Sequence, residues 1–206
     1  MADHETEDEQ LRALKEWWSE NGRSVIAGVV IGIGTLIGWK SWNVYQEQQA
    51  LEASAKYNAI RSSALAQNLD GVIVLAEELK KDFKSTPYAS LAAMILAKAK
   101  AEKGETSEVV NNLQWVIENS KQESVATIAK LRLARVYIAD QDIEKAEALL
   151  NESYPVAYTS LLQELRGDML SAKGEIQAAR EAYDSAINSA EGNEVDYLKM
   201  KRDNLG

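Results

Sequence analysis

The longest uncharged stretch of the chain lies near the N-terminal end, where sixteen residues, SVIAGVVIGIGTLIGW, separate Arg23 from Lys40. A lysine close to a helix end can extend its ammonium group to a membrane surface, so the apolar helix can continue to Trp42. From Val25 to Trp42 an α-helix would be about 27 Å long, close to the roughly 30 Å hydrocarbon core of a bilayer. The pattern predicts a transmembrane helix over residues 24–42.

Tryptophans flank this stretch on both sides. Four of the five tryptophans in the chain bracket it, Trp17 and Trp18 before it and Trp39 and Trp42 after it. Together with Lys40 they are the residue types that anchor a spanning helix at the two membrane interfaces. A cleaved signal peptide is not expected, because the preceding region is long and acidic and no small-x-small cleavage site adjoins the apolar run.

Two features of the span bear on orientation and partners. Three basic residues precede it and only Lys40 and the more distant Lys56 follow it, which favours a cytoplasmic N-terminus. Glycines recur four residues apart within it, as small-xxx-small pairs on two helix faces where other membrane helices could approach closely. The alternative is that these glycines have no partner, since glycine is common in membrane helices. The paired glycines are Gly28, Gly32, Gly34 and Gly38.

Residues 1–23 form an acidic tail with seven acidic and three basic residues. Leu11, Leu14 and Trp18 share one helical face there, which indicates a short amphipathic helix on the membrane surface. An ordinary extension of the membrane helix explains the same pattern equally well.

Residues 43–206 show a different pattern, with apolar positions at helical spacing and short breaks of turn-forming residues. Proline occurs twice and phenylalanine once in the whole chain, whereas good helix formers are abundant. The expected fold is therefore all-α, a series of helix hairpins. The breaks are expected at Asn68–Gly71, Ser85–Pro87, Lys103–Glu105, Asn119–Ser120, Ala139–Asp142, Pro155, Lys173–Glu175 and Glu191–Asn193.

The hairpins resemble tetratricopeptide repeats. Their turns at Gly104, Gln141 and Gly174 are 37 and 33 residues apart, near the repeat's period of 34. An earlier pair, about 47–83, is degenerate, and residues 195–205 could form a capping helix. Such hairpins stack into a curved solenoid that binds proteins or peptides on its concave surface. The residues expected at the repeat's packing and turn positions are Ala97, Gly104, Ala134, Tyr137, Ala146, Gly167, Gly174, Ala179, Tyr183 and Ala186.

The inventory of reactive side chains argues against catalysis. Cysteine is absent and the only histidine is His4, so thiolate, imidazole and most metal chemistry lack their ligands. The acidic triplet Asp140, Asp142 and Glu144 begins like a calcium loop, but Lys145 replaces the glycine that such a loop requires. A net charge of −9 without a basic patch makes nucleic acid an unexpected partner. No enzyme and no cofactor are predicted.

A more specific resemblance covers nearly the whole chain. The aromatic pair at residues 17–18, the Glu-Asn-Gly-Arg of residues 20–23 and the Gly-Trp-Lys-Ser-Trp of residues 38–42 resemble the N-terminal pattern of the YfgM family of bacterial inner-membrane proteins. The similarity extends through residues 131–135, 165–167 and 200–205, LRLAR, LRG and MKRDNL.

The resemblance implies a bacterial inner-membrane protein with a single transmembrane helix, a cytoplasmic N-terminus and a periplasmic repeat domain. It further implies an ancillary subunit of the Sec translocon that works with a PpiD-like membrane-anchored chaperone on exported protein clients. The alternative function is a membrane-tethered scaffold for another envelope assembly, without direct client contact.

Overall fold

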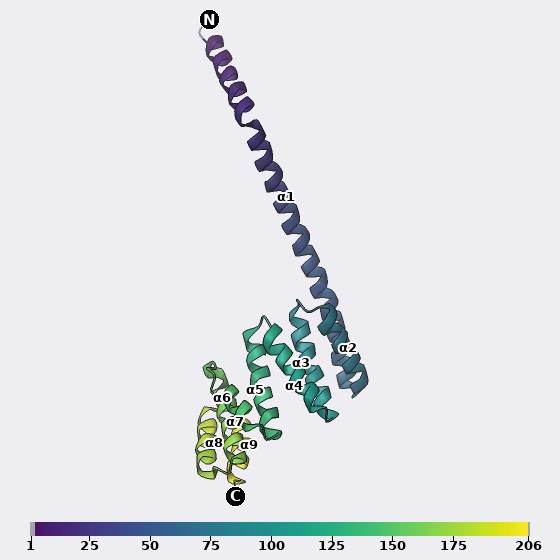
Figure 1. The fold of residues 1–206 in the computed structure, drawn as a ribbon, viewed down its shortest axis with the longest axis vertical. Coiled ribbons are helices and arrows are strands. Elements are labelled where there is room, and N and C mark those ends of the chain that lie inside the picture. Colours follow the sequence, from purple (N-terminus) through teal and green to yellow (C-terminus); the bar gives the residue numbers. More distant parts are fainter. Residues whose placement is uncertain (1–2, 206) are drawn as a thin grey trace. The chain divides into compact units, whose positions relative to one another are not determined.

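The computed structural model describes residues 3–205, with side chains from Glu9 onward, and every regular element in that part of the chain is helical. The chain divides into two compact units, Met1–Gln49 and Ala50–Gly206. Figure 1 labels the elements. They are α1 (Asp3–Leu65), α2 (Leu69–Asp82), α3 (Pro87–Glu102), α4 (Thr106–Asn119), α5 (Glu123–Ala139), α6 (Ile143–Leu150), a 3₁₀ turn η1 (Val156–Tyr158), α7 (Thr159–Ala172), α8 (Ile176–Ser189) and α9 (Glu194–Asp203).

The first unit consists of the N-terminal part of α1. The helix has no break between the region around Leu14 and the apolar run. The residues that could form a separate surface helix are therefore a continuous extension of the apolar helix. The glycines leave the helix intact, and Thr35 donates a hydrogen bond of 2.8 Å to the carbonyl of Ile31 one turn earlier. Within the described residues, this is the one helix long and apolar enough to cross a membrane.

The second unit begins at Ala50, whereas the sequence predicts a domain boundary at Asn43. Residues 43–49 continue α1, and the side chains of Val44 and Tyr45 remain about half exposed. The last turns of α1 do enter the core of the second unit, where Ala53 and Ile60 are fully buried among residues of α2 and α3.

The second unit is a stack of helix hairpins, as the sequence predicts (Figure 1). The end of α1 pairs with α2, α3 with α4, α5 with α6 and α7 with α8, while α9 packs on α8. Each break predicted from turn-forming residues coincides with an interhelical segment to within two residues. Pro87 is the first residue of α3. Proline has no backbone N–H, but at this position of a helix the N–H would have no partner within the helix.

Four hairpin turns share one hydrogen-bonding pattern. The residue after the turn donates its backbone N–H five residues back, as in Asn68 to Ser63, Glu105 to Lys100, Asp142 to Tyr137 and Glu175 to Leu170. This is the Schellman motif, which requires a left-handed residue just before the donor. Glycine fills that position at Gly104 and Gly174, but glutamine fills it at Gln67 and Gln141, with φ of 56° and 62°.

Small side chains let the helices approach closely. Two apolar clusters form the core, one around α1, α2 and α3 and the other from α3 to α7, and Trp115 packs against both. Alanines that are fully or almost fully buried line the helix contacts, including Ala89, Ala92 and Ala93 on α3. Trp115 of α4 therefore links the two clusters.

Candidate functional site

The four glycines of the apolar run lie on the surface of α1. A Cβ atom added at Gly28, Gly32, Gly34 or Gly38 would meet no other atom of the chain within 4 Å. Large apolar side chains surround them, among them Ile31 and Ile37, which are more than 60% exposed. The surface of the first unit is therefore apolar, and at the four glycines the helix backbone itself is exposed.

The aromatic residues at the two ends of this run are also exposed. Trp17, Trp18, Trp39 and Trp42 are each at least half exposed, and Lys40 is exposed between the last two. The ring centroids of Trp17 and Trp18 are 6.4 Å apart, and those of Trp42 and Tyr45 are 5.9 Å apart. At Gly22, which the sequence identifies only as part of the Glu-Asn-Gly-Arg pattern, the Trp18 indole lies so close that an added Cβ would be 3.2 Å from it.

In the repeat unit, Gly167 and Tyr183 form a close contact between α7 and α8. An added Cβ at Gly167 would lie 2.7–2.9 Å from three ring atoms of Tyr183, which is nearly fully buried between α7 and α8. The Tyr183 hydroxyl donates a hydrogen bond of 2.6 Å to the Asp168 carboxylate. Burial, and then this hydrogen bond, raises the pKa of Tyr183 well above its ordinary value.

The structure places the remaining repeat residues in two settings. Gly104 and Gly174 occupy turns with φ of 73° and 78°. The other residues singled out from the repeat pattern are buried in the stack: Ala97, Ala134, Tyr137, Ala146, Ala179 and Ala186.

A charge network around one buried carboxylate connects three helices. Glu164 on α7 is only 4% exposed. It accepts hydrogen bonds from Arg135 of α5 at 3.2 Å and from Lys201 of α9 at 2.8 Å. Lys201 also donates to Asp168 at 2.7 Å. Burial works against the charged form of Lys201, but the hydrogen bonds to Asp168 and Glu164 outweigh it, so the pKa of Lys201 is raised.

This network was not predicted from the sequence. The paired residues are separated by 29 to 37 positions along the chain. No short-range sequence pattern predicts a pairing over that distance. The only available signal was an acidic residue at position 164 on an otherwise core-facing helix side.

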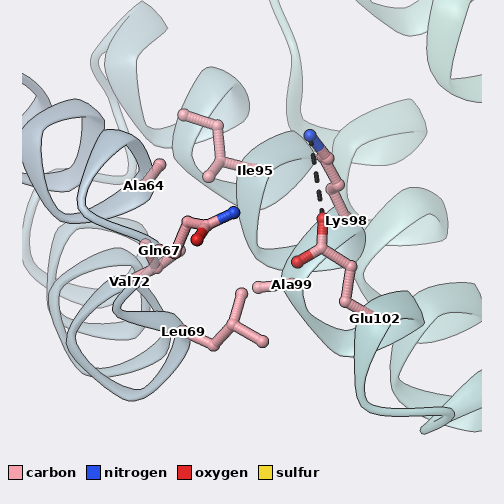
Figure 2. A pocket seen from close by; sticks show the side chains of 8 residues that line it. All are labelled: Ala64, Gln67, Leu69, Val72, Ile95, Lys98, Ala99 and Glu102. Carbon is pink, nitrogen blue, oxygen red and sulfur yellow. Dashed lines mark ion pairs between the residues drawn. The ribbon is translucent and has the colours of Figure 1, made fainter.

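Cavities lie between the helices from the end of α1 to α6. Figure 2 shows one of about 310 Å³, where Ala64, Gln67 and Leu69 face Lys98 and Glu102 of α3. The Lys98 ammonium and the Glu102 carboxylate are 3.7 Å apart at its edge, and the Lys98 side chain is 75% exposed.

A larger cavity of about 530 Å³ lies between α3, α4 and α5. Its walls are mainly apolar, with Met94 and Ala97 from α3, Val109 and Leu113 from α4, and Val136 from α5. A neighbouring cavity of about 330 Å³ shares Met94, Lys98 and Arg132 with it. Concave, mainly apolar surfaces of this volume suit the binding of side chains from another molecule.

Groups with catalytic potential are engaged in local ion pairs. Lys145 donates to the Asp142 carboxylate in the calcium-like triplet, and this hydrogen bond lowers the pKa of Asp142. Lys173, two residues from Ser171, has its pKa raised by the hydrogen bond to Glu175 and by the charge of Glu147, so it is held protonated and unsuited to act as a base. Across the described residues, His, Asp and Glu form no cluster suited to a metal ion.

Comparison with known proteins gives consistent matches over all or nearly all of the chain. Residues 15–206 match the model of a tetratricopeptide repeat-like domain. The chain is 31% identical to the ancillary SecYEG translocon subunit of Escherichia coli, covering 100% of this chain and 99% of that relative. It is 30% identical to the protein of the same name from Haemophilus influenzae, covering 97% of each. No solved structure matches significantly.

Proposed function

Since the chain belongs to the family of ancillary SecYEG translocon subunits, with its tetratricopeptide repeat-like domain, we propose that it is a non-catalytic, membrane-anchored binding module of the SecYEG translocon. The observation that carries the proposal is the extent of the similarity, which includes the apolar N-terminal segment as well as the repeats. A shared repeat alone would indicate protein binding without indicating the partner.

The proposed arrangement places residues 1–23 in the cytoplasm, residues 24–42 across the inner membrane and residues 43–206 in the periplasm. The excess of basic residues before the apolar run supports this orientation. The chain has no cysteine, so single cysteines at Ser19 and Asn58, both exposed, can report it directly. An impermeant maleimide should label Asn58→Cys and not Ser19→Cys in cells with a permeabilised outer membrane, and the reverse result would refute the orientation.

Association with SecYEG is tested by affinity capture. A tagged copy of the full chain, extracted from membranes in mild detergent, should co-purify the translocon subunits, whereas a tagged single-pass protein of unrelated sequence should not. Absence of translocon subunits from the captured material, with the chain itself intact and inserted, would contradict the proposal.

The finer part of the proposal is a chaperone role for newly exported proteins, in company with a PpiD-like membrane-anchored partner. Resemblance to the YfgM family supports this role, and the cavities along the hairpin helices supply surfaces on which partner segments could bind. Suppression of aggregation of an unfolded exported protein by the purified chain is the expected result. A chain that captures SecYEG but leaves aggregation unchanged would instead act as a tethered scaffold.

A further inference from the structure

Ion pairs join α7 to α5, the first helix of the preceding hairpin, and to the last helix, α9. Arg135 of α5 pairs with Glu164 of α7, and Lys201 of α9 pairs with Glu164 and Asp168 of α7. Carboxylates of α7 thus pair with a basic side chain on each of these two helices, and the charges at both interfaces are compensated.

The interface between α3 and α5 breaks this pattern. The cavities of about 530 and 330 Å³ there are lined by three charged residues, Lys98, Arg132 and Arg135, and all three are basic. The one acidic residue nearby, Asp140, lines a third, smaller cavity of about 230 Å³ at the end of α5. Arg135 is engaged by Glu164. Lys98 pairs at 3.7 Å with Glu102 one turn further along its own helix, and both side chains of this pair are exposed. Arg132 is exposed and makes no ion pair within the part of the chain that the structure describes.

This concentration of positive charge runs against the charge of the whole molecule, which has 32 acidic and 23 basic residues. The basic groups also border apolar walls formed by side chains such as Met94 and Val136. A surface of this kind combines a site for apolar side chains with guanidinium and ammonium donors, and guanidinium is well suited to bind a carboxylate through two hydrogen bonds.

We propose that the groove between α3 and α5 binds a partner-protein segment in which acidic and large apolar residues alternate. The acidic side chains of that segment would pair with Arg132 and Lys98, and the apolar ones would enter the two cavities. The inference rests on the proposed function, since it names the kind of segment that the binding module would accept.

A defined peptide pair tests the charge requirement. The probe is a fluorescein-labelled twelve-residue peptide that repeats Leu-Glu-Phe-Glu, and its control repeats Leu-Gln-Phe-Gln. Binding is measured by fluorescence anisotropy to the full chain in phosphatidylcholine nanodiscs. The acidic peptide should bind at least about tenfold more tightly, the effect of one charge-assisted hydrogen bond. Equal binding of the two peptides would overturn the proposal.

Substitutions in the chain locate the site. The double variant Lys98→Gln with Arg132→Gln should weaken binding of the acidic peptide about tenfold and leave the amide peptide unaffected. Arg180→Gln, at an exposed position of α8 outside both cavities, should bind like the parent. Unchanged affinity in the double variant, with an unchanged melting temperature, would overturn the proposal. So would binding of phosphatidylglycerol vesicles through these residues without binding of the peptide.

Capture of SecYEG separates this inference from the proposed function. If the parent chain captures no translocon subunits but binds the acidic peptide through Arg132, the proposed function is wrong and the groove assignment stands. If SecYEG is captured while the peptide binds nowhere on the chain, the groove assignment is wrong and the proposed function stands.

Discussion

At position 167 only a hydrogen atom fits, because the Tyr183 ring fills the space where a Cβ would lie. Gly167→Ala should therefore lower the free energy of unfolding by about 1–3 kcal/mol, the usual effect of forcing an extra carbon into a packed interface. Urea unfolding of the full chain in detergent, followed by circular dichroism, measures the change. Ala172→Val, at an exposed site near the end of the same helix, is the matched control.

The contact itself can be tested with a second change at Tyr183. In a Tyr183→Leu background the ring atoms are gone, so the additional cost of Gly167→Ala should be smaller than in the parent. If Gly167→Ala costs the same in both backgrounds, or nothing in the parent, the close approach of α7 and α8 at this point is not what restricts residue 167.

A second residue-scale prediction concerns Gln141, which holds a left-handed backbone conformation where Gly104 and Gly174 occupy the equivalent turns. A residue with a Cβ loses roughly 1–2 kcal/mol of stability in this conformation, and glycine removes that strain. Part of the gain is offset, because glycine loses more conformational entropy on folding. Gln141→Gly should thus stabilise the repeat unit by about 0.5–1 kcal/mol. Gln141→Ala should give no such gain, because it keeps the Cβ. A higher unfolding midpoint for the alanine variant would contradict the explanation.

At the scale of elements, the sequence predicts the hairpins well because their ends are local events. Glycine, proline and asparagine mark the turns, and the apolar period within α3 to α8 places the core. The continuity of α1 beyond Trp42 was not predicted, because residues 43–65 contain helix formers without a breaker and a helix has no reason to end where hydrophobicity ends. The network around Glu164 was not predicted either, because it depends on which helices become neighbours in the folded chain.

The glycine pairs of α1 give a prediction for the apolar element. None of the four sites has a neighbouring atom that an added side chain would strike, so leucine there should not disturb the chain itself. Helix association in lipid depends on close backbone approach. We therefore expect Gly28→Leu with Gly32→Leu, or Gly34→Leu with Gly38→Leu, to insert normally, since leucine raises hydrophobicity, and to reduce co-purification of SecYEG.

The control for this prediction is a leucine pair away from the glycines. Val29→Leu with Ile33→Leu uses two exposed apolar positions at the same spacing and should retain the captured partners in full. If both glycine double variants also retain them, the glycine strips are incidental, and the repeat unit would have to make the contact with the translocon.

At the scale of the whole repeat unit, stability should be lost at alkaline pH. Lys201 belongs to the network that joins α5, α7 and α9, and Tyr183 of α8 is attached to it through the hydrogen bond to Asp168. Both residues have raised pKa values, Tyr183 chiefly through burial and Lys201 through its carboxylate partners, which outweigh burial. The pKa of Tyr154 is also raised, to about 12, chiefly by burial. A group whose pKa is raised by folding contributes stability that is present below its unfolded pKa, near 10 for these residues, and is lost as the pH rises further.

The expected profile is a free energy of unfolding that stays level between about pH 7 and pH 9 and falls above about pH 10. Tyr183→Phe keeps the ring against Gly167 but cannot ionise, so its stability should fall less steeply in the alkaline range. At neutral pH the same variant should be slightly less stable than the parent, because Asp168 loses a hydrogen-bond donor. Tyr45→Phe, which alters an exposed tyrosine of α1 outside this network, should follow the parent's profile. If Tyr183→Phe declines as steeply as the parent, ionisation of the buried tyrosine is not what opens the α7–α8 hairpin at high pH.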